Sequence, residues 1–266
     1  MYINSVKLVY FSPNRTTKKV VEGIAEAIRV NAVDHLDLTP PEARTRGFEE
    51  LRDELVIIGT PVYSCRVPVD AVDRLRRLKA NNTPAIIVVV YGNVDYKDAL
   101  LELNNIATEI GCKPVAAGVF IGEHSVLPIA YGRPDAEDLK KAREFGEKIG
   151  EKLKDTKAIG DASPLQIPGS FPYYTMQPTP KEALQVYPAT EEMLCTKCET
   201  CAEVCPTAAI TINDTVITDL DTCILCGACV KICPTQARVM DSPHYRQIVE
   251  SVSKNSPERK EPEIFI

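Results

Sequence analysis

Residues 85–91 read Ala-Ile-Ile-Val-Val-Val-Tyr, an unbroken run of apolar and mostly β-branched side chains. A strand that is buried on both faces is apolar throughout, whereas a strand with one exposed face alternates apolar and polar residues. The run therefore predicts a central strand of a parallel sheet that helices cover on both sides. Four further segments are predicted to be strands of the same sheet: residues 6–11, 32–38, 55–59 and 115–121.

Helical segments alternate with these strands. Residues 16–30 repeat apolar side chains at helical spacing, among them Val20 and Ile24. Residues 134–153 begin with a proline, which is typical of a helix N-terminus. Two more helices are predicted at residues 69–79 and 95–110. Strands that alternate with helices predict an α/β fold with a doubly wound, five-stranded parallel sheet over residues 1–154.

The sequence changes character after this domain. Residues 155–190 contain six prolines, which disfavour both helices and sheet interiors, so we predict an extended linker with a reach of roughly 100 Å. Its aromatic side chains suggest that it lies along a surface. Residues 242–266 form a C-terminal tail whose apolar end, residues 264–266, either docks on the first domain or a second subunit, or frays.

Eight of the ten cysteines lie between these two segments, in residues 191–241. They form two runs of C-x2-C-x2-C-x3-C-P that are 28 residues apart. In such a run, three closely spaced thiolates bind three irons of one cubane cluster, and the fourth cysteine ligates the other cluster. One [4Fe-4S] cluster is thus predicted on Cys195, Cys198, Cys201 and Cys233, and a second on Cys223, Cys226, Cys229 and Cys205.

Zinc, disulfides and a purely structural metal site are the alternatives. Tetrahedral zinc normally takes two separated pairs of ligands and does not require a third close cysteine and a proline. The N-terminal residues show no secretory signal, which disfavours disulfides. A domain of about 50 residues also needs metal–thiolate bonds in order to fold. Residues 191–241 resemble the bacterial two-cluster ferredoxins, which implies a small α+β domain with low-potential clusters.

Three loops follow the carboxyl ends of predicted strands, where ligands bind in open α/β sheets. Residues 12–17 run directly into a helix and offer hydroxyls, an amide and backbone N–H groups to a phosphate, although Ser12 and Thr16 could equally cap that helix. Residues 59–68 and 91–96 each contribute an aromatic side chain that could flank a flat ring. Neither G-x-G-x-x-G nor G-x-x-x-x-G-K-[ST] follows the first strand, which disfavours a nicotinamide dinucleotide site and a nucleotide triphosphatase.

In these loops, residues 1–154 resemble the flavodoxin family, although Arg15 stands in the place of the usual glycine of the phosphate loop. The resemblance implies the strand order 2-1-3-4-5 and non-covalently bound FMN. It assigns the phosphate to Ser12, Asn14, Arg15, Thr16 and Thr17. It assigns the isoalloxazine ring to Thr60, Pro61, Val62 and Tyr63, together with Tyr91, Gly92, Asn93 and Tyr96.

Both parts together resemble the flavodoxin–ferredoxin fusion proteins of anaerobes. This resemblance implies an intracellular electron-transfer iron–sulfur flavoprotein, in which electrons pass between two low-potential clusters and FMN. The alternative is an FMN-dependent reductase of a quinone or nitro compound that the clusters supply with electrons; an open cavity over the ring would favour that enzyme. A redox or iron sensor is a third hypothesis.

Charge narrows the expected partners. A net charge of −6 disfavours binding to nucleic acid or to an anionic membrane. Residues 191–241 contain eight acidic and three basic residues, which either steer a basic redox partner or keep the domain soluble. No apolar run approaches the about 18 residues of a transmembrane helix, so a cytoplasmic protein is expected. The reach of the linker predicts a homodimer in which the clusters of one chain serve the FMN of the other.

Four single residues lie in or near the predicted sites or in the core. Cys65 either faces the flavin or is an ordinary loop residue, and Cys112 is predicted to be buried packing. His124 either donates a proton to the reduced flavin or is an ordinary loop histidine. Gly227, between two cluster ligands, is predicted to permit a close turn.

Overall fold

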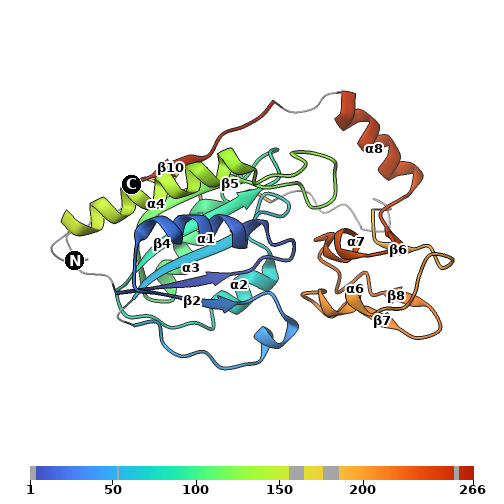
Figure 1. Ribbon diagram of the computed structural model, residues 1–266, viewed down its shortest axis with the longest axis horizontal. Helices are drawn as coiled ribbons and strands as arrows, with labels where there is room; N and C mark the ends of the chain where they lie inside the picture. The colour runs from blue at the N-terminus through green and yellow to red at the C-terminus, as the bar shows by residue number, and fades with distance from the viewer. Residues whose placement is uncertain (1–3, 53, 156–164, 176–185, 255–257) are drawn as a thin grey trace.

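The computed structural model describes residues 4–52, 54–155, 165–175, 186–254 and 258–266 and shows an α/β domain beside a cysteine-rich domain (Figure 1). The α/β domain has five parallel strands in the predicted order 2-1-3-4-5. They are β1 (Ser5–Tyr10), β2 (Ala32–Asp37), β3 (Leu55–Pro61), β4 (Thr83–Tyr91) and β5 (Cys112–Ile121). All residues of β3 and β4 are buried, as the continuous apolar runs predict.

Helices cover both faces of the sheet. Helices α1 (Thr16–Ile28) and α4 (Ala136–Asp155) share one apolar cluster with the sheet, and α2 (Val69–Leu75) and α3 (Ala99–Glu109) share the other. A short 3-10 helix, η1 (Pro41–Arg44), follows β2. Cys112 is buried in the core, as expected. This layered arrangement confirms the predicted fold class.

The helix expected from Asp95 begins instead at Ala99. Asn93 and Lys97 have φ angles of 62° and 42°, and residues in this left-handed region interrupt a right-handed helix. The loop after β4 is therefore longer than the sequence pattern predicts, and its residues Asn93 and Tyr96 contact the C-terminal tail.

The C-terminal tail returns to the first domain and adds a sixth strand to the sheet. Helix α8 (Pro243–Lys254) is followed by β10 (Glu263–Phe265), which pairs antiparallel with the edge strand β5. Figure 1 shows the tail running from α8 back over the α/β domain. Of the three alternatives for the end of the tail, the structure shows docking on the first domain.

Two stretches of the predicted linker, residues 156–164 and 176–185, lie outside the described residues. Residues 165–175 lie against α3: the Asp98 carboxylate accepts hydrogen bonds from the backbone N–H groups of Ser170 and Tyr174, at 2.9 and 2.6 Å. The Arg66 guanidinium lies over the Tyr173 ring, 4.9 Å from its centroid. This part of the linker thus follows the surface of the first domain.

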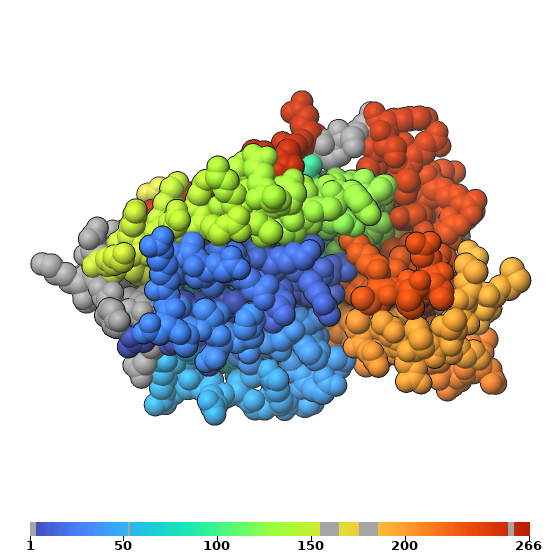
Figure 2. Space-filling view, in the orientation of Figure 1, coloured from blue at the N-terminus to red at the C-terminus, as the bar shows by residue number. Residues whose placement is uncertain are grey.

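The cysteine-rich domain is small and nearly symmetric. Two short helices, α6 (Thr200–Glu203) and α7 (Ala228–Ile232), each follow the first two cysteines of a run. Two antiparallel pairs complete the domain: β6 (Ala189–Thr190) with β9 (Arg238–Val239), and β7 (Ile210–Ile212) with β8 (Val216–Thr218). Figures 1 and 2 show this domain in contact with one end of the α/β domain. Every helix in the described ranges is too short or too polar to cross a bilayer.

Candidate functional site

A cavity of about 980 Å³ lies at the carboxyl ends of the parallel strands. Its size is at the upper end of the range for small-molecule and cofactor sites. Of the thirteen residues that the sequence assigns to FMN, nine line it: Ser12, Asn14, Thr16, Thr17, Pro61, Val62, Tyr63, Tyr91 and Gly92. The other four, Arg15, Thr60, Asn93 and Tyr96, are not among its lining residues.

The loop to which the sequence assigns the phosphate has a left-handed residue at its end although it contains no glycine. Arg15 has φ 61° and directly precedes α1, so its backbone adopts the left-handed conformation for which glycine is usually chosen. The Ser12 hydroxyl accepts a hydrogen bond of 3.0 Å from the N–H of Lys18 and so caps α1. Thr17 is fully buried, and its hydroxyl has no partner among the described residues. A ligand oxygen in the cavity would satisfy that group.

Asn14 connects the phosphate loop to the cysteine-rich domain. Its Nδ2 donates a hydrogen bond of 2.7 Å to the carbonyl oxygen of Cys226, and it lies 3.5 Å from the hydroxyl of Ser125. Its buried Oδ1 has no partner in the described part of the chain. An amide oxygen accepts hydrogen bonds, so it suits a ligand hydroxyl better than a phosphate.

The second loop is a tight turn over the cavity. Tyr63 and Arg66 exchange backbone hydrogen bonds of 3.0 Å, and Ser64 and Cys65 between them have φ angles of 50° and 64°. The turn is held by Arg66, whose guanidinium makes two hydrogen bonds of 2.6 and 2.8 Å to the Glu102 carboxylate. Burial of the Tyr63 hydroxyl raises its pKa, to which the neighbouring Cys226 adds. Cys65 also lines the cavity.

The third loop, after β4, lines the cavity and also forms hydrogen bonds with the C-terminal tail. The Asn93 side chain donates to the carbonyl of Glu258 at 2.9 Å and accepts from the N–H of Lys260 at 3.0 Å. The Tyr96 hydroxyl donates to the Glu263 carboxylate at 3.0 Å. The flavodoxin resemblance assigns both residues to the ring. Their contacts with the tail could not be predicted, because they link positions that are far apart in the sequence.

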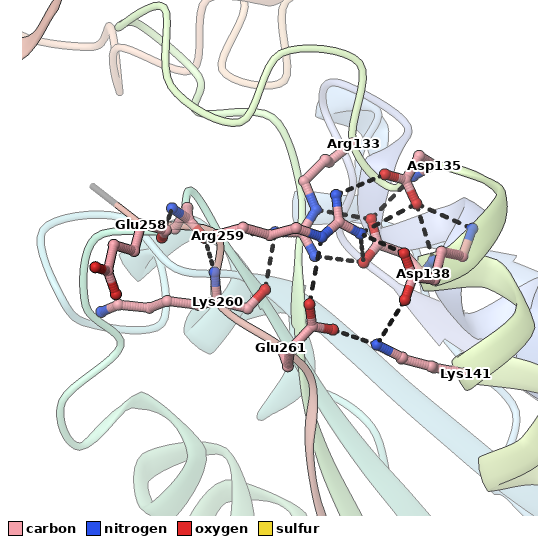
Figure 3. Close-up of polar contacts among 10 residues, drawn as sticks. Arg133, Asp135, Asp138, Lys141, Glu258, Arg259, Lys260 and Glu261 are labelled. Carbon is pink, nitrogen blue, oxygen red and sulfur yellow. Dashed lines mark hydrogen bonds and ion pairs between the residues drawn. The ribbon is translucent and has the colours of Figure 1, made fainter. Parts of the chain in front are cut away.

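Figure 3 shows the ionic network that fastens the tail. Arg133 and Asp138 form a buried ion pair, and Arg259 reaches both Asp138 and Asp135. The hydrogen bonds from Arg259 hold the pKa of Asp135 well below its usual range. Lys141 pairs with Glu261 on the same side.

His124 lies in the loop after β5 and lines the cavity. Its Nδ1 accepts hydrogen bonds from the backbone N–H groups of Val126 and Leu127, at 3.2 and 3.0 Å. Burial lowers its pKa to about 4, and the nearby Lys231 contributes in the same direction. The ring is therefore neutral near pH 7, with its proton on Nε2. This environment supports the interpretation as a structural loop histidine rather than as an acid.

Of the fourth loop only His124 is a candidate from the sequence, and one wall of the cavity was missed. Residues 122–126 follow β5 and line the cavity, and the rule that ligands bind at strand carboxyl ends applies to them as well. The missed wall consists of residues 221–225, which belong to the cysteine-rich domain. No sequence signal places the two domains together.

A second, smaller cavity lies within the cysteine-rich domain. Cys205, Cys223, Cys226 and Cys229 all line it, and this is the second predicted ligand set, including the cysteine from the other run. Hydrogen bonds reach these sulfurs: the N–H of Ala209 donates to Cys205 Sγ at 3.2 Å, and Arg238 Nη2 lies 3.9 Å from Cys229 Sγ. Such contacts are typical of iron–sulfur ligands.

Three of the remaining four cysteines are more exposed. Cys198 is exposed, Cys195 and Cys233 are half-buried, and Cys201 is buried. In the described ranges, no three His, Cys, Asp or Glu side chains converge closely enough to hold a single ion. A cubane spreads its four thiolates over four irons, so the donor sets agree in chemistry and number with two [4Fe-4S] clusters.

Comparison with known proteins follows the same division of the chain. Residues 194–237 match the family described as "4Fe-4S dicluster domain". The chain joins a flavodoxin-like domain to a 4Fe-4S dicluster domain. A search of curated proteins gave no match.

Solved structures resemble the flavodoxin-like domain. A flavodoxin from the domain Archaea is 16% identical over 56% of this chain and 99% of its own, with a TM-score of 0.39. A Fusobacterium nucleatum flavodoxin bound to flavin mononucleotide is 13% identical over 56% and 99% of the two chains, with a TM-score of 0.40. An NADH:FMN oxidoreductase (EMOB) in its apo form is 17% identical over 58% and 92%, with a TM-score of 0.44.

The two domains meet at the second cysteine set. Cys223 and Ile224 line both the large cavity and the cysteine cavity. Ile224 also packs against the core of the flavodoxin-like domain. The wall between the two candidate cofactor sites is therefore one short segment of the dicluster domain.

Polar contacts fix this arrangement. Arg74 is buried, and its guanidinium donates to the carbonyl of Pro206, the residue after Cys205, at 2.6 Å. Lys231 of α7 pairs with Glu123 at 2.8 Å. A Cβ on Gly227 would lie 2.3 Å from the carbonyl oxygen of Ser125. Gly227 has φ 70°, but the equivalent Glu199 of the first run has φ 66° without being glycine. The close approach to Ser125, rather than the turn alone, requires the glycine.

Proposed function

We propose that this chain is an electron-transfer protein that passes electrons between two [4Fe-4S] clusters and FMN within one molecule. The observation that carries the proposal is the shared wall: Cys223 and Ile224 line both the large cavity and the cysteine cavity. A ligand of one redox group thus borders the site of the other. When bound, FMN would exchange either one or two electrons, whereas each cluster exchanges one electron at a time.

The residues of the large cavity support FMN. Thr16 and Thr17 at the N-terminus of α1 would hold the phosphate, together with Ser12. The buried, unpartnered hydroxyl of Thr17 fits this role. Tyr63 and Tyr91 would border the ring, and Asn14 would bind a ligand hydroxyl while it holds the cluster loop. Burial lowers the pKa of His124 to about 4, so its neutral ring would supply a hydrogen-bond donor rather than an acid.

The exposed cysteine set supports an external redox partner at the first cluster. Cys198 is exposed, and the preceding Met193 and Leu194 are 99% and 50% exposed. Glu191, Glu192 and Glu199 belong to the same segment and are also exposed. We infer that a partner protein with a basic rim and an apolar centre docks here, exchanging electrons with the first cluster, while the second cluster serves FMN.

Two cysteines that occupy equivalent places in the repeat provide the test. Anaerobically prepared protein should contain about eight irons and one FMN per chain, according to the ligand count. Cys205→Ala should remove the cluster beside the cavity, and Cys233→Ala the outer one. With a chemical reductant that acts only through the clusters, C205A should abolish rapid reduction of FMN. Zinc in place of iron, or equal effects of C205A and C233A on the inner cluster, would contradict the proposal.

The size of the cavity favours a second candidate function. The cavity of about 980 Å³, whose lining includes the polar residues Asp73, Asp95 and Thr222, has space for a small substrate beside the flavin. The chain would then be a reductase of a quinone or nitro compound that the clusters supply with electrons. Multiple turnovers of menadione or nitrofurazone by the reduced protein, with saturation, would support the enzyme. Turnover that stays far slower than reduction of FMN would support the carrier.

A homodimer remains a prediction from the length of the linker. The dicluster domain already borders the cavity of its own chain, so this arrangement needs no second copy for electron transfer. Light scattering at micromolar concentration tests the prediction: a mass of twice 29.3 kDa would support a homodimer, and a mass of 29.3 kDa would refute it.

A further inference from the structure

Arg238 is the most deeply buried basic residue of the dicluster domain. It lies in β9 and is 3% exposed. In the described part of the chain, its guanidinium makes no ion pair with a carboxylate; its nitrogens contact only neutral oxygens and a sulfur. A buried guanidinium is costly unless another negative group compensates its charge.

Three neutral groups hold the guanidinium in place. Nη1 donates to the hydroxyl of Thr190 at 2.5 Å, and Nη2 donates to the hydroxyl of Thr218 at 2.6 Å. The carbonyl oxygen of Pro188 lies 3.5 Å from Nη2. Pro188 and Thr218 both line the cavity of the second cysteine set. The cation is thus fixed at the edge of the inner cluster site.

The nearest anionic groups are cluster ligands. Nη2 lies 3.9 Å from Cys229 Sγ, a predicted ligand of the inner cluster. The positive charge also acts on Cys201, a predicted ligand of the outer cluster: burial raises the pKa values of the Cys201 and Cys229 thiols, and Arg238 offsets part of that rise in both. The hydrogen bond, however, reaches only the inner ligand.

The internal repeat shows that this feature is not part of the repeated unit. Cys201 and Cys229 are equivalent positions, and the residue equivalent to Arg238 is Ile210, 28 residues earlier. Ile210 is buried and apolar. The outer cluster therefore has no such cation in the corresponding place, and the two sites differ in charge although their ligands are the same.

From these contacts we infer that Arg238 is a positioning residue that raises the reduction potential of the inner cluster above that of the outer cluster. Reduction adds one negative charge to a cluster that four thiolates already make anionic, and a fixed buried cation beside it stabilises the reduced form. The potential difference would direct electrons from the outer cluster toward the flavin side. This inference rests on the proposed function, because it requires both clusters.

The test compares reduction potentials in the full-length protein. Arg238→Met removes the charge, Arg238→Gln removes the charge but keeps a donor, and Arg238→Lys keeps the charge but loses the guanidinium fork. Arg246→Met is the control, because Arg246 pairs with Asp241 on the surface and its loss changes the net charge equally. Anaerobic titrations followed by EPR give both cluster potentials.

We expect R238M and R238Q to make reduction of the inner cluster at least tenfold less favourable, a decrease of about 59 mV or more. The outer cluster should shift less, R238K should lie between wild type and R238M, and R246M should resemble wild type. Unchanged potentials in R238M or R238Q with a full iron content would overturn the inference, as would a larger shift of the outer cluster.

Loss of clusters in the variants is also informative. If R238M and R238Q fail to retain iron but R238K retains it, the need for a positive charge supports the inference. If all three fail, the role of Arg238 is structural and the inference is wrong. Absence of clusters from the wild-type protein would instead refute the proposed function, so the two failures can be told apart.

Discussion

Among single residues of the candidate site, Arg15 and Asn14 differ from what the sequence predicts, in backbone conformation or in binding partner. Arg15 replaces a glycine yet keeps the left-handed backbone, with φ 61°. Asn14 is predicted to bind phosphate, but its Nδ2 bonds the carbonyl of Cys226 instead. Such contacts between positions 212 residues apart leave no trace in local sequence. The loops could be predicted from the strand ends, whereas the partner of each side chain could not.

Replacing Thr17 tests the phosphate site. Its buried hydroxyl has no partner in the described ranges, so Thr17→Val should leave the apoprotein as stable as wild type or more stable. The affinity for FMN should fall by about 1–3 kcal/mol, or roughly 5- to 150-fold. Fluorescence titration with FMN and urea unfolding of the apoprotein measure the two effects.

Thr83→Val is the matched control, because the buried Thr83 hydroxyl already donates to the carbonyl of Leu51 at 2.7 Å. This variant should lose stability and keep its affinity for FMN. A T17V variant that binds FMN as tightly as wild type would show that Thr17 does not hold the ligand.

Gly227→Ala should separate the two domains. The added Cβ would lie 2.3 Å from the Ser125 carbonyl oxygen, so the contact must open, at about 1–3 kcal/mol. Glu199→Ala at the equivalent position should change stability by no more than about 0.5 kcal/mol, because that residue is exposed. Small-angle scattering should show a more extended molecule for G227A alone, with iron retained. A compact G227A variant would contradict the interface.

His124 predicts a dependence of stability on pH. Its pKa in the folded protein is lowered to about 4 from 6.5, so the unfolded chain binds more protons between these values. Stability is therefore complete above pH 6.5 and declines as the pH falls toward 4, by about 2 kcal/mol at pH 5. His124→Asn keeps an acceptor for the two backbone N–H groups and should remove this part of the decline in urea unfolding. Identical pH profiles for both proteins would contradict the assignment.

At the scale of elements, the long apolar strands and the repeated cysteines were predictable, and the short tail strand was not. Strands β3 and β4 are buried on both faces, as their unbroken apolar runs predict. In contrast, β10 has three residues and pairs with β5, and the residues just before it, Arg259 and Glu261, form ion pairs with helix α4. A segment this short has no periodicity of its own.

Asn93→Ala should release this tail. The variant loses the two hydrogen bonds to the backbone at residues 258 and 260, so we expect a loss of about 1–3 kcal/mol. Hydrogen exchange should become faster in β10 and along the facing edge of β5. Asn105→Ala, which removes an exposed hydrogen bond to Tyr173, serves as control and should leave exchange in β10 unchanged. Unaltered exchange in N93A would show that the loop does not hold the tail.

At the scale of the whole molecule, the dicluster domain is held against the flavodoxin-like domain from several sides. Arg74 binds the backbone carbonyl of Pro206, which follows Cys205, and Asn14 binds the backbone carbonyl of Cys226. The chain then returns through α8 and the tail to the far edge of the same sheet (Figure 1). Attachment at both ends of the dicluster domain favours electron transfer within one chain.

The rate of FMN reduction is the most direct test of electron transfer within one chain. In anaerobic stopped-flow experiments, the clusters are reduced first and the appearance of reduced FMN is followed at protein concentrations that span two decades. The account predicts one first-order rate at all concentrations, which C205A abolishes. A rate that rises in proportion to protein concentration would show that electrons pass between separate molecules and would contradict the account.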